Sequence, residues 1–300
     1  MKVHVTGARG FLGRDVVQSL MSLGDVRGTD VDDLDIARAS QVLARLRVDR
    51  PDVVIHLAAL KGNVPSRQRP VAFFRVNTQG TLNLLEACRR LGISRFIFMS
   101  SVTVVGHAET PADESWPIRP LHPYAASKAA AEALVHAYAR SYGIRAVILR
   151  PNFIVGAIPP PHPYRDNLIY DFVAKVDRRG AIELIGDPGF QREWLHPSDV
   201  SRAVRLAVEA DLPDCETFML SANRCTMREL AELIVRRVGC GRVTVDPAGA
   251  GFTLISSSAK AHRLLGWQPR VTLDEIVAEI WEEYRSRSGR RREADAATRR

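Results

Sequence analysis

Tyr124 and Lys128 are the pair whose types and spacing could carry acid–base chemistry. The stretch "YAASK" places them four residues apart, which is one turn of a helix, so both side chains lie on one face. An ammonium group close to a phenol favours the phenolate and lowers the pKa of the tyrosine. The tyrosine can then donate or accept a proton near neutral pH. The alternative is a chance pair, because this spacing is common.

Ser101 adds a hydroxyl group to this pair. It follows the apolar run "FIFMS", where we expect a strand to end. A hydroxyl at such a position can form a hydrogen bond with a substrate oxygen. A glycine-rich turn, Ser101, Tyr124 and Lys128 follow one another in the chain at expected strand ends, and together they predict proton transfer to and from a bound substrate.

The glycine-rich turn contains Gly7, Gly10 and Gly13. Residues 2–6 alternate like a strand, and residues 11–23 have the apolar spacing of a helix. In a strand-to-helix turn, glycine lets the backbone bend tightly and approach a phosphate, and the free N–H groups of the helix attract a pyrophosphate. We therefore predict a dinucleotide site; the alternative is a flexible or purely structural turn.

Two charged residues give opposite indications of the dinucleotide. Asp30 ends the second expected strand, where a carboxylate can bind the adenosine ribose and would repel a 2′-phosphate, which favours NAD. Arg9 precedes Gly10 and could pair with a 2′-phosphate, which favours NADP. We predict NAD, because Asp30 would face the ribose directly. Either residue could also be an ordinary surface charge.

The elements that must position these residues alternate along the first half of the chain. Expected strands are "VHVTG", "DVRGTD", "PDVVIHLAA", "RFIFMSS" and "RAVILRP", and expected helices cover residues 11–23, 40–47, 70–91 and 123–142. The strands are apolar on both faces, as in a parallel sheet between helices. The pattern predicts an α/β fold, a doubly wound parallel sheet of the Rossmann-like type, with ligands at the carboxyl ends of the strands.

The pattern changes after Arg150, where "PNFIVGAIPPPHPY" is too rich in proline for regular structure. We predict a smaller, discontinuous C-terminal substrate-binding region made of about residues 156–191 and 223–284, with two amphipathic helices in its second segment. The NAD-binding domain then comprises residues 1–155 and about 192–222.

The composition is that of an ordinary globular protein, with 46% hydrophobic and 25% charged residues. No apolar run is long enough to span a membrane, so no membrane partner is expected. Because a strand is expected from residue 2, we expect no signal peptide and a cytoplasmic location. The four cysteines lack CxxC spacing, so neither a metal site nor a disulfide is expected.

The net charge of +8 is concentrated at the C-terminal end. Residues 285–300 hold seven arginines against two acidic residues, and they lack aromatics and periodicity. We predict that these residues form a disordered basic tail. Because the remaining charge is spread over the chain, no specific nucleic-acid partner is expected.

Taken together, the motifs resemble those of an extended short-chain dehydrogenase/reductase of the NAD-dependent epimerase/dehydratase family, and most closely its sugar-nucleotide 4-epimerases. The matching stretches run from residue 3 to about 281 and include "TGARGFLG", "HLAALK", "VNTQGTLNLLEA", "SSVTVVG", "YAASK", "GFQREWLHPSDV" and "AKAHRLLGWQP". The resemblance implies bound NAD and a nucleotide-sugar substrate. It also implies a homodimer through the helices at 70–91 and 123–142, although packing on the sheet would equally explain their apolar faces.

The resemblance also implies a role for each matching position. Tyr124 transfers the proton, Lys128 also holds the nicotinamide ribose, and Ser101 orients the substrate hydroxyl or carbonyl. The residues implied to contact the cofactor are Gly7, Gly10, Phe11, Leu12, Gly13, Asp30, Asp35, Ile36, Leu57, Ala58, Ala59, Lys61, Asn77, Tyr124 and Lys128. Among them, the two alanines could instead be core residues, and the asparagine could cap a helix.

The residues after Ser101 bear on the reaction. Val102 and Thr103 stand where dehydratases of the family carry an acid and a base and where its decarboxylases carry a glutamate, and neither transfers a proton at neutral pH. We therefore expect epimerisation at C4 of a nucleoside-diphosphate sugar rather than elimination. The alternative enzyme is an NAD(P)-dependent carbonyl reductase or dehydrogenase on a sugar nucleotide or another small substrate. A non-catalytic dinucleotide-sensing protein is the other class, against which the intact catalytic set argues.

The residues implied to contact the substrate are Ser101, Asn152, Asn167 and Arg192. Arg192 matches the first of two arginines that family enzymes use on a diphosphate, but the expected place of the second, near "DPAGAGF", holds none. Phe153 stands where the family often has a substrate-contacting asparagine, and Asn152 lies one position earlier. A nucleotide sugar is therefore expected to have fewer contacts here than in the family pattern.

Overall fold

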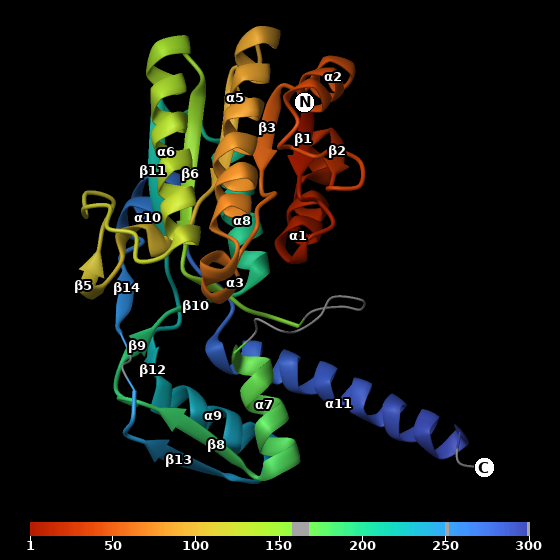
Figure 1. Ribbon diagram of the computed structural model, residues 1–300, viewed down its shortest axis with the longest axis vertical. Helices are drawn as coiled ribbons and strands as arrows, with labels where there is room; N and C mark the ends of the chain where they lie inside the picture. Colours follow the sequence, from red (N-terminus) through yellow and green to blue (C-terminus); the bar gives the residue numbers. More distant parts are fainter. Residues whose placement is uncertain (158–167, 250–251, 299–300) are drawn as a thin grey trace.

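The protein is built around a six-stranded sheet with helices on both faces (Figure 1). The computed structural model describes residues 1–157, 168–249 and 252–298, and of residues 289–298 it describes the backbone alone. The sheet strands are β1 (Lys2–Thr6), β2 (Asp25–Thr29), β3 (Val53–His56), β4 (Arg95–Met99), β6 (Arg145–Pro151) and β11 (Cys215–Leu220). They lie in the order β11-β6-β4-β3-β1-β2, and each neighbouring pair is parallel.

This order confirms the predicted doubly wound sheet. From β1 the chain first proceeds to β2 at one edge, then returns past β1 to β3 and continues to β11 at the other edge. The direction of winding therefore reverses between β1 and β3, and ligands of such sheets bind in the crevice outside the carboxyl ends of the strands at that point. The glycine-rich turn follows β1 and lies at this crevice.

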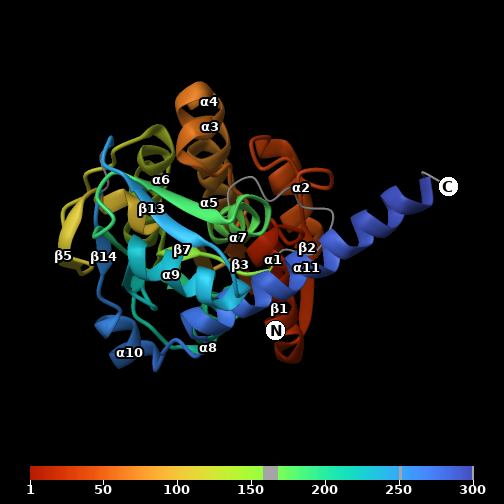
Figure 2. The same cartoon turned by 90° about the horizontal axis from the view of Figure 1, so that it is seen from below.

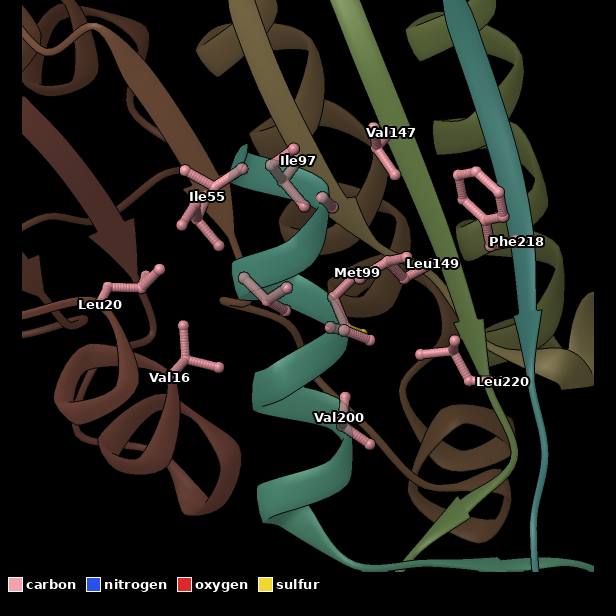
Figure 3. Packing of buried hydrophobic residues seen from close by; sticks show 14 of the residues in the cluster. Val16, Leu20, Ile55, Ile97, Met99, Val147, Leu149, Val200, Phe218 and Leu220 are labelled. Carbon is pink, nitrogen blue, oxygen red and sulfur yellow. The ribbon is translucent and has the colours of Figure 1, made fainter. Parts of the chain in front are cut away.

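Apolar cores cover both faces of the sheet, as the continuous apolar strands predict. Side chains alternate between the faces, so that Ile97 of β4 joins one core and its neighbour Phe96 the other. Helices α1 (Phe11–Leu20) and α8 (Pro197–Glu209) cover the first face, and Figure 3 shows side chains of both helices packed against the strands. The second face is covered by α2 (Ala39–Asp49), α5 (Gly80–Leu91) and α6 (Pro123–Tyr142).

Helix α6, which carries the predicted acid–base pair, has the bounds predicted for it. Pro123 occupies its first turn, where the missing N–H costs nothing. His122 caps it, because the ring Nδ1 accepts a hydrogen bond from the Ala125 N–H at 3.2 Å. Gly143 ends it in the left-handed conformation, with φ of 68°. Such local signals are visible in the sequence.

The helix predicted at 70–91 is divided. It consists of α4 (Pro70–Phe73), a π-helical turn (Phe74–Gln79) and α5, and it is preceded by α3 (Asn63–Gln68). The wider π-helical turn contains Asn77, one of the predicted cofactor-lining residues. Single π-helical turns within α-helices are frequent at functional sites.

A second region lies beyond the carboxyl ends of the strands (Figure 1). Its elements are α7 (Leu168–Arg179), β8 (Ala181–Ile185), α9 (Met227–Val238), β13 (Arg242–Asp246) and α11 (Leu273–Thr298). They share one hydrophobic core, and β8 pairs with β13. Short strand pairs lie in the segments that join it to the sheet, β7 (Phe153–Ile154) with β10 (Trp194–Leu195) and β9 (Gln191–Arg192) with β12 (Cys225–Thr226).

Part of the segment assigned to the second region, 223–284, packs with the sheet instead. Strand β14 (Leu254–Ser256) pairs with β5 (Ala108–Ala112), and α10 (Ala259–Leu265) packs against β11. The Trp267 indole is buried in the same core and donates a hydrogen bond to a carbonyl of α8 at 2.8 Å. The segment therefore contains three helices rather than two, because α10 lies between α9 and α11.

The prediction of a disordered tail from residue 285 is not what the structure shows. Helix α11 continues to Thr298 and extends beyond the rest of the chain in both views (Figures 1 and 2). Alanine, arginine and glutamate favour helix, and Glu283 forms an ion pair with Arg287 one turn along. Like every other helix in the described ranges, it lacks the combination of length and apolar character needed to cross a membrane.

Candidate active site

The glycine-rich turn is so tightly packed that it requires its glycines. Gly7 has a φ of +73°, and a Cβ atom there would lie 2.7 Å from the Ala58 nitrogen. A Cβ atom on Gly13 would lie 2.1 Å from the Gly7 carbonyl oxygen. Gly10 precedes the first residue of α1, so the free N–H groups of that helix begin at the turn. The turn therefore fits a dinucleotide pyrophosphate.

The Asp30 carboxylate lies at the end of β2 and shapes the same turn. It accepts hydrogen bonds from the Arg9 and Val31 backbone N–H groups, at 3.1 and 2.9 Å. The Arg9 guanidinium points to other carboxylates, at 2.5 Å from Asp33 and 3.2 Å from Asp32. Because these carboxylates already pair with Arg9 and would repel a 2′-phosphate, the arrangement favours NAD over NADP.

This arrangement yields a prediction on cofactor preference. We expect the protein to bind NAD more tightly than NADP, and Asp30→Ala to reduce the ratio of the two affinities by about tenfold, the effect of ~1.4 kcal/mol. Fluorescence titration of both dinucleotides measures the ratio. Asp25→Ala, at the opposite end of β2, is the matched control and should leave it unchanged. Tighter binding of NADP by the parent protein would show that Arg9 decides the preference.

Two of the residues implied to contact the cofactor are held by protein contacts. The Asp35 carboxylate accepts a hydrogen bond from the Ala37 N–H at 3.0 Å and pairs with Arg38. The Ile36 side chain is buried against the position of Gly80, where an added Cβ would lie 2.7 Å from the isoleucine Cδ1 atom. Both residues thus fix the loop after β2, and the glycine at the start of α5 makes room for it.

The residues after β3 lie between the sheet and the crevice. Leu57 and Ala58 are half-buried, and they pack against the hydrophobic cores on opposite faces of the sheet. Ala58 is therefore in part a core residue, which was the alternative to a cofactor contact. Ala59 is half-buried, and Lys61 is exposed. The Ala58 N–H donates to the Thr6 hydroxyl at 3.3 Å, which ties this segment to the end of β1.

Asn77 is fully buried and holds this segment in place. Its Oδ1 atom accepts from the Leu60 N–H at 2.8 Å, and its Nδ2 atom donates to the Leu60 carbonyl and the Ser127 hydroxyl, both at 2.9 Å. The side chain therefore joins the segment after β3 to α6 and does not cap a helix. The sequence offered no signal for Ser127, which completes this link within the "YAASK" motif.

His56 forms a second buried link between these elements, and like Ser127 it was not among the predicted site residues. Its Nδ1 atom lies 2.8 Å from the Thr6 hydroxyl and its Nε2 atom 3.1 Å from the Thr81 hydroxyl. Burial and the nearby Lys128 charge place the pKa of His56 well below its usual value, so the ring is neutral. It connects β1, β3 and α5 beneath the crevice.

Ser101 and Tyr124 meet as predicted. The Ser101 side chain lies close enough to the Tyr124 phenol to lower its pKa, and the Ser101 oxygen lies 2.9 Å from the Thr103 hydroxyl. The Tyr124 ring is stacked on the His122 ring, with their centroids 5.9 Å apart, and it meets the Phe73 ring edge-on, with centroids 6.3 Å apart. These two contacts fix the plane of the Tyr124 ring. The two hydroxyl groups therefore present one hydrogen-bonding point to a substrate oxygen.

The predicted effect of Lys128 on Tyr124 is not found. Burial raises the pKa of Tyr124, and the interaction that lowers it comes from Ser101. Lys128 is only 2% exposed, its ammonium donates to the Met99 carbonyl at 2.7 Å, and burial lowers its own pKa to about 7. Spacing placed both residues on one face, but it could not reveal how completely the lysine is desolvated.

The amide nitrogen of Asn152, a residue predicted to contact the substrate, is engaged by other residues of the protein. The side chain is buried, and its Nδ2 atom donates to Glu193 at 2.6 Å and to Ser256 at 3.2 Å. Arg224 binds the other oxygen of the same carboxylate at 2.9 Å. Asn152 therefore belongs to a polar cluster that joins the end of β6 to β14. Asn167 lies outside the described residues.

Arg192 lies within a cage of three aromatic rings. Its guanidinium carbon is 4.7 Å from the Phe153 ring centroid, 5.3 Å from that of Phe190 and 5.5 Å from that of Phe252. Burial lowers the pKa of this arginine, and its Nε atom is buried without a hydrogen-bond partner. No carboxylate in residues 1–157, 168–249 or 252–288 forms an ion pair with it.

The sequence and the structure of this chain have close counterparts. Residues 3–218 match the sequence model of the NAD dependent epimerase/dehydratase family. The chain belongs to this family. The family enzyme dTDP-glucose 4,6-dehydratase of Streptomyces niveus is 31% identical over 95% of this chain and 93% of its own length. The prediction of an NAD-dependent enzyme is thereby confirmed.

Solved structures of the family have the same architecture. The Thermus thermophilus UDP-glucose 4-epimerase, in complex with NAD, superimposes with a TM-score of 0.83 at 29% identity, over 95% of this chain and 99% of that one. The Thermotoga maritima UDP-glucose 4-epimerase, with UDP-glucose, has a TM-score of 0.85 at 28% identity, over the same shares. The family fold thus spans nearly the whole of this chain.

Proposed function

We propose that this enzyme epimerises C4 of a nucleoside-diphosphate sugar and retains its NAD through the reaction. The observation that carries the proposal is the caged Arg192. Arg192 is half-buried and its Nε atom fully so, and a guanidinium withdrawn from water in this way is unfavourable unless an anion pairs with it. The diphosphate of a nucleotide-sugar substrate would supply that anion. The crystal structure of the related Thermotoga maritima epimerase is one with UDP-glucose. The phenylalanine rings would keep water away and so strengthen the pairing of the one arginine with the diphosphate.

The hydroxyl groups of Ser101 and Tyr124 would handle the proton. Ser101 would hold the C4 oxygen of the sugar, and Tyr124 would take the C4 hydroxyl proton and later return it. NAD, when bound, supplies the hydride acceptor and donor, and its oxidised ring carries positive charge that favours the Tyr124 phenolate. Arg192 would tether the diphosphate while the sugar ring turns to present its other face.

The residues after Ser101 favour this reaction over elimination. Val102 is buried and apolar, and the Thr103 hydroxyl is engaged with Ser101. Neither can remove a C5 proton or protonate a departing C6 hydroxyl at neutral pH. The proposal therefore places this chain with the epimerases of its family, although a dehydratase is 31% identical to it.

The proposal is tested with a panel of UDP-, GDP- and dTDP-hexoses and no added cofactor. We expect at least one hexose to yield its C4 epimer, which chromatography separates. Consumption of added NADH or NAD with a carbonyl or alcohol, without any epimer, would instead identify a reductase or dehydrogenase. A 4-keto-6-deoxy product would identify a dehydratase.

Arg192→Gln provides a specific prediction for the substrate site. A charge-assisted hydrogen bond is worth roughly 1.5–3 kcal/mol, so we expect KM to rise by about 10- to 150-fold while kcat changes little. Steady-state kinetics with the hexose from the panel measures both constants. Arg242→Gln, at the exposed start of β13, is the control and should leave them unchanged. An unchanged KM in the Arg192 variant would exclude the proposed diphosphate contact.

A further inference from the structure

The active-site face of α6 continues one turn further than the acid–base pair. Tyr124, Lys128 and Glu132 follow at intervals of four residues, so they lie along one face of the helix. The Lys128 and Glu132 residues are 2% and 0% exposed. The row thus ends in a carboxylate that the predicted chemistry does not use.

Both oxygens of the Glu132 carboxylate are occupied. Arg150, in β6, donates from Nε to one oxygen at 2.9 Å and from Nη2 to the other at 2.6 Å. Ser100 donates its hydroxyl to the first oxygen at 2.5 Å. A buried ion pair is by itself weak evidence for stability, because apolar residues of similar volume often serve as well. Stability alone therefore does not explain why a buried ion pair of Glu132 and Arg150 lies next to the active site.

The contacts of Glu132 lead directly to the catalytic residues. Ser100, which binds its carboxylate, immediately precedes Ser101, and the Ser100 N–H donates to Leu149 of β6 at 2.8 Å. The Lys128 ammonium donates to Met99, the residue before Ser100. Met99 and Ser100, which lead directly into Ser101, are thus held by α6 and β6 together.

We propose that Glu132 is a positioning residue of the active site. Its carboxylate, clamped by Arg150, binds the Ser100 hydroxyl and so fixes the strand end that carries Ser101 and the Met99 carbonyl to which the Lys128 ammonium donates; the carboxylate also stands one helical turn from that lysine as an opposite charge. The proposal rests on Tyr124 as the proton-transferring residue and on Lys128 as the residue that holds the nicotinamide ribose, but not on the identity of the sugar.

The charged groups around Lys128 make Glu132 the source of this effect. From α6 come Tyr124 and Glu132, and β3 contributes His56, which is neutral. β6 contributes Arg150, whose charge is engaged by Glu132. Burial lowers the pKa of Lys128, and the charge of Glu132 opposes that effect. The carboxylate thus favours the charged form of Lys128, which burial disfavours.

The test is Glu132→Gln, which keeps the shape of the side chain and removes its charge. With 15N-labelled lysine, NMR follows the Lys128 ammonium, whose signal is assigned by its loss in Lys128→Met. We expect the pKa of Lys128 to fall by about one unit or more, because its opposite charge is gone. In kinetics, kcat should fall by about tenfold or more with little change in KM, and the alkaline limb of the kcat profile should move to lower pH.

Glu132→Gln leaves the buried Arg150 without an ion-pair partner, which could prevent folding. A second variant avoids this problem. Glu132→Met combined with Arg150→Met removes both charges and leaves no buried ion without a partner. It should show the same lower pKa of Lys128. Glu86→Gln, which disrupts an exposed ion-pair cluster on α5, is the control and should leave Lys128 unaffected.

A purely structural role predicts a different result. The proposal would be overturned if Glu132→Gln, or the double methionine variant, folds and shows the same pKa of Lys128 and the same pH profile of kcat as the parent protein. The titration needs no substrate, so its result is independent of the proposed epimerisation. If the hexose panel gave no product but the titration shifted as described, the positioning role would stand and the assigned reaction would fail.

Discussion

Replacing Tyr124 by phenylalanine is expected to lower kcat by ~10²–10⁴-fold, the usual contribution of a positioned proton-transfer group. The substitution removes only the hydroxyl, so the ring keeps its contacts with His122 and Phe73. NAD affinity should therefore stay close to that of the parent. Steady-state kinetics and a dinucleotide titration measure the two effects.

Tyr138→Phe is the matched control for this experiment. Its hydroxyl lies on the same helix but contacts Glu86, at 3.3 Å, on the side of α5. We expect parental kinetics from this variant. Activity of the Tyr124 variant within tenfold of the parent would remove Tyr124 from the role of proton donor and acceptor.

Gly13→Ala is expected to destroy the dinucleotide site. The added Cβ would lie 2.1 Å from the Gly7 carbonyl oxygen and 2.8 Å from backbone atoms of Ala8. Backbone atoms of the turn cannot move away without dismantling it, so we expect NAD affinity to fall by more than about 100-fold. Overpacking of this kind also costs stability, and the free energy of unfolding should fall by about 3 kcal/mol.

A glycine outside the turn, with open space around it, provides the control. Gly92 ends α5 with a φ of +69°, and an added Cβ there meets nothing within 4 Å. Gly92→Ala should cost only about 1 kcal/mol, from the left-handed backbone, and leave NAD binding unchanged. Denaturant unfolding and NAD titration of both variants measure these effects. Parental NAD affinity in Gly13→Ala would refute the assigned turn.

Features encoded over a few neighbouring residues could be predicted from the sequence. The bounds of β1 and α6 follow from apolar spacing and from cap residues at their ends, and the structure has them as predicted. The parallel sheet follows from strands that are apolar on both faces. The proximity of Ser101 and Tyr124 follows in turn, because Ser101 follows the end of β4 and Tyr124 lies in the first turn of α6, at the same edge of the sheet.

Features that depend on packing between distant segments could not be predicted. The cage around Arg192 combines Phe153, Phe190 and Phe252, which come from three separate loops and strands. The motif alignment placed Asn152 near the substrate, but its amide turns toward Glu193. The state of the acid–base pair depends on burial, which spacing along a helix does not give.

Deuterium at C4 tests the epimerase account most directly. The hexose selected from the panel is prepared with deuterium on C4 and incubated with the protein, with no added cofactor. We expect the epimerised product to keep its deuterium at C4, because the hydrogen removed from the sugar stays in the closed site and returns to the same carbon. An epimer that carries solvent hydrogen at C4 would contradict the account.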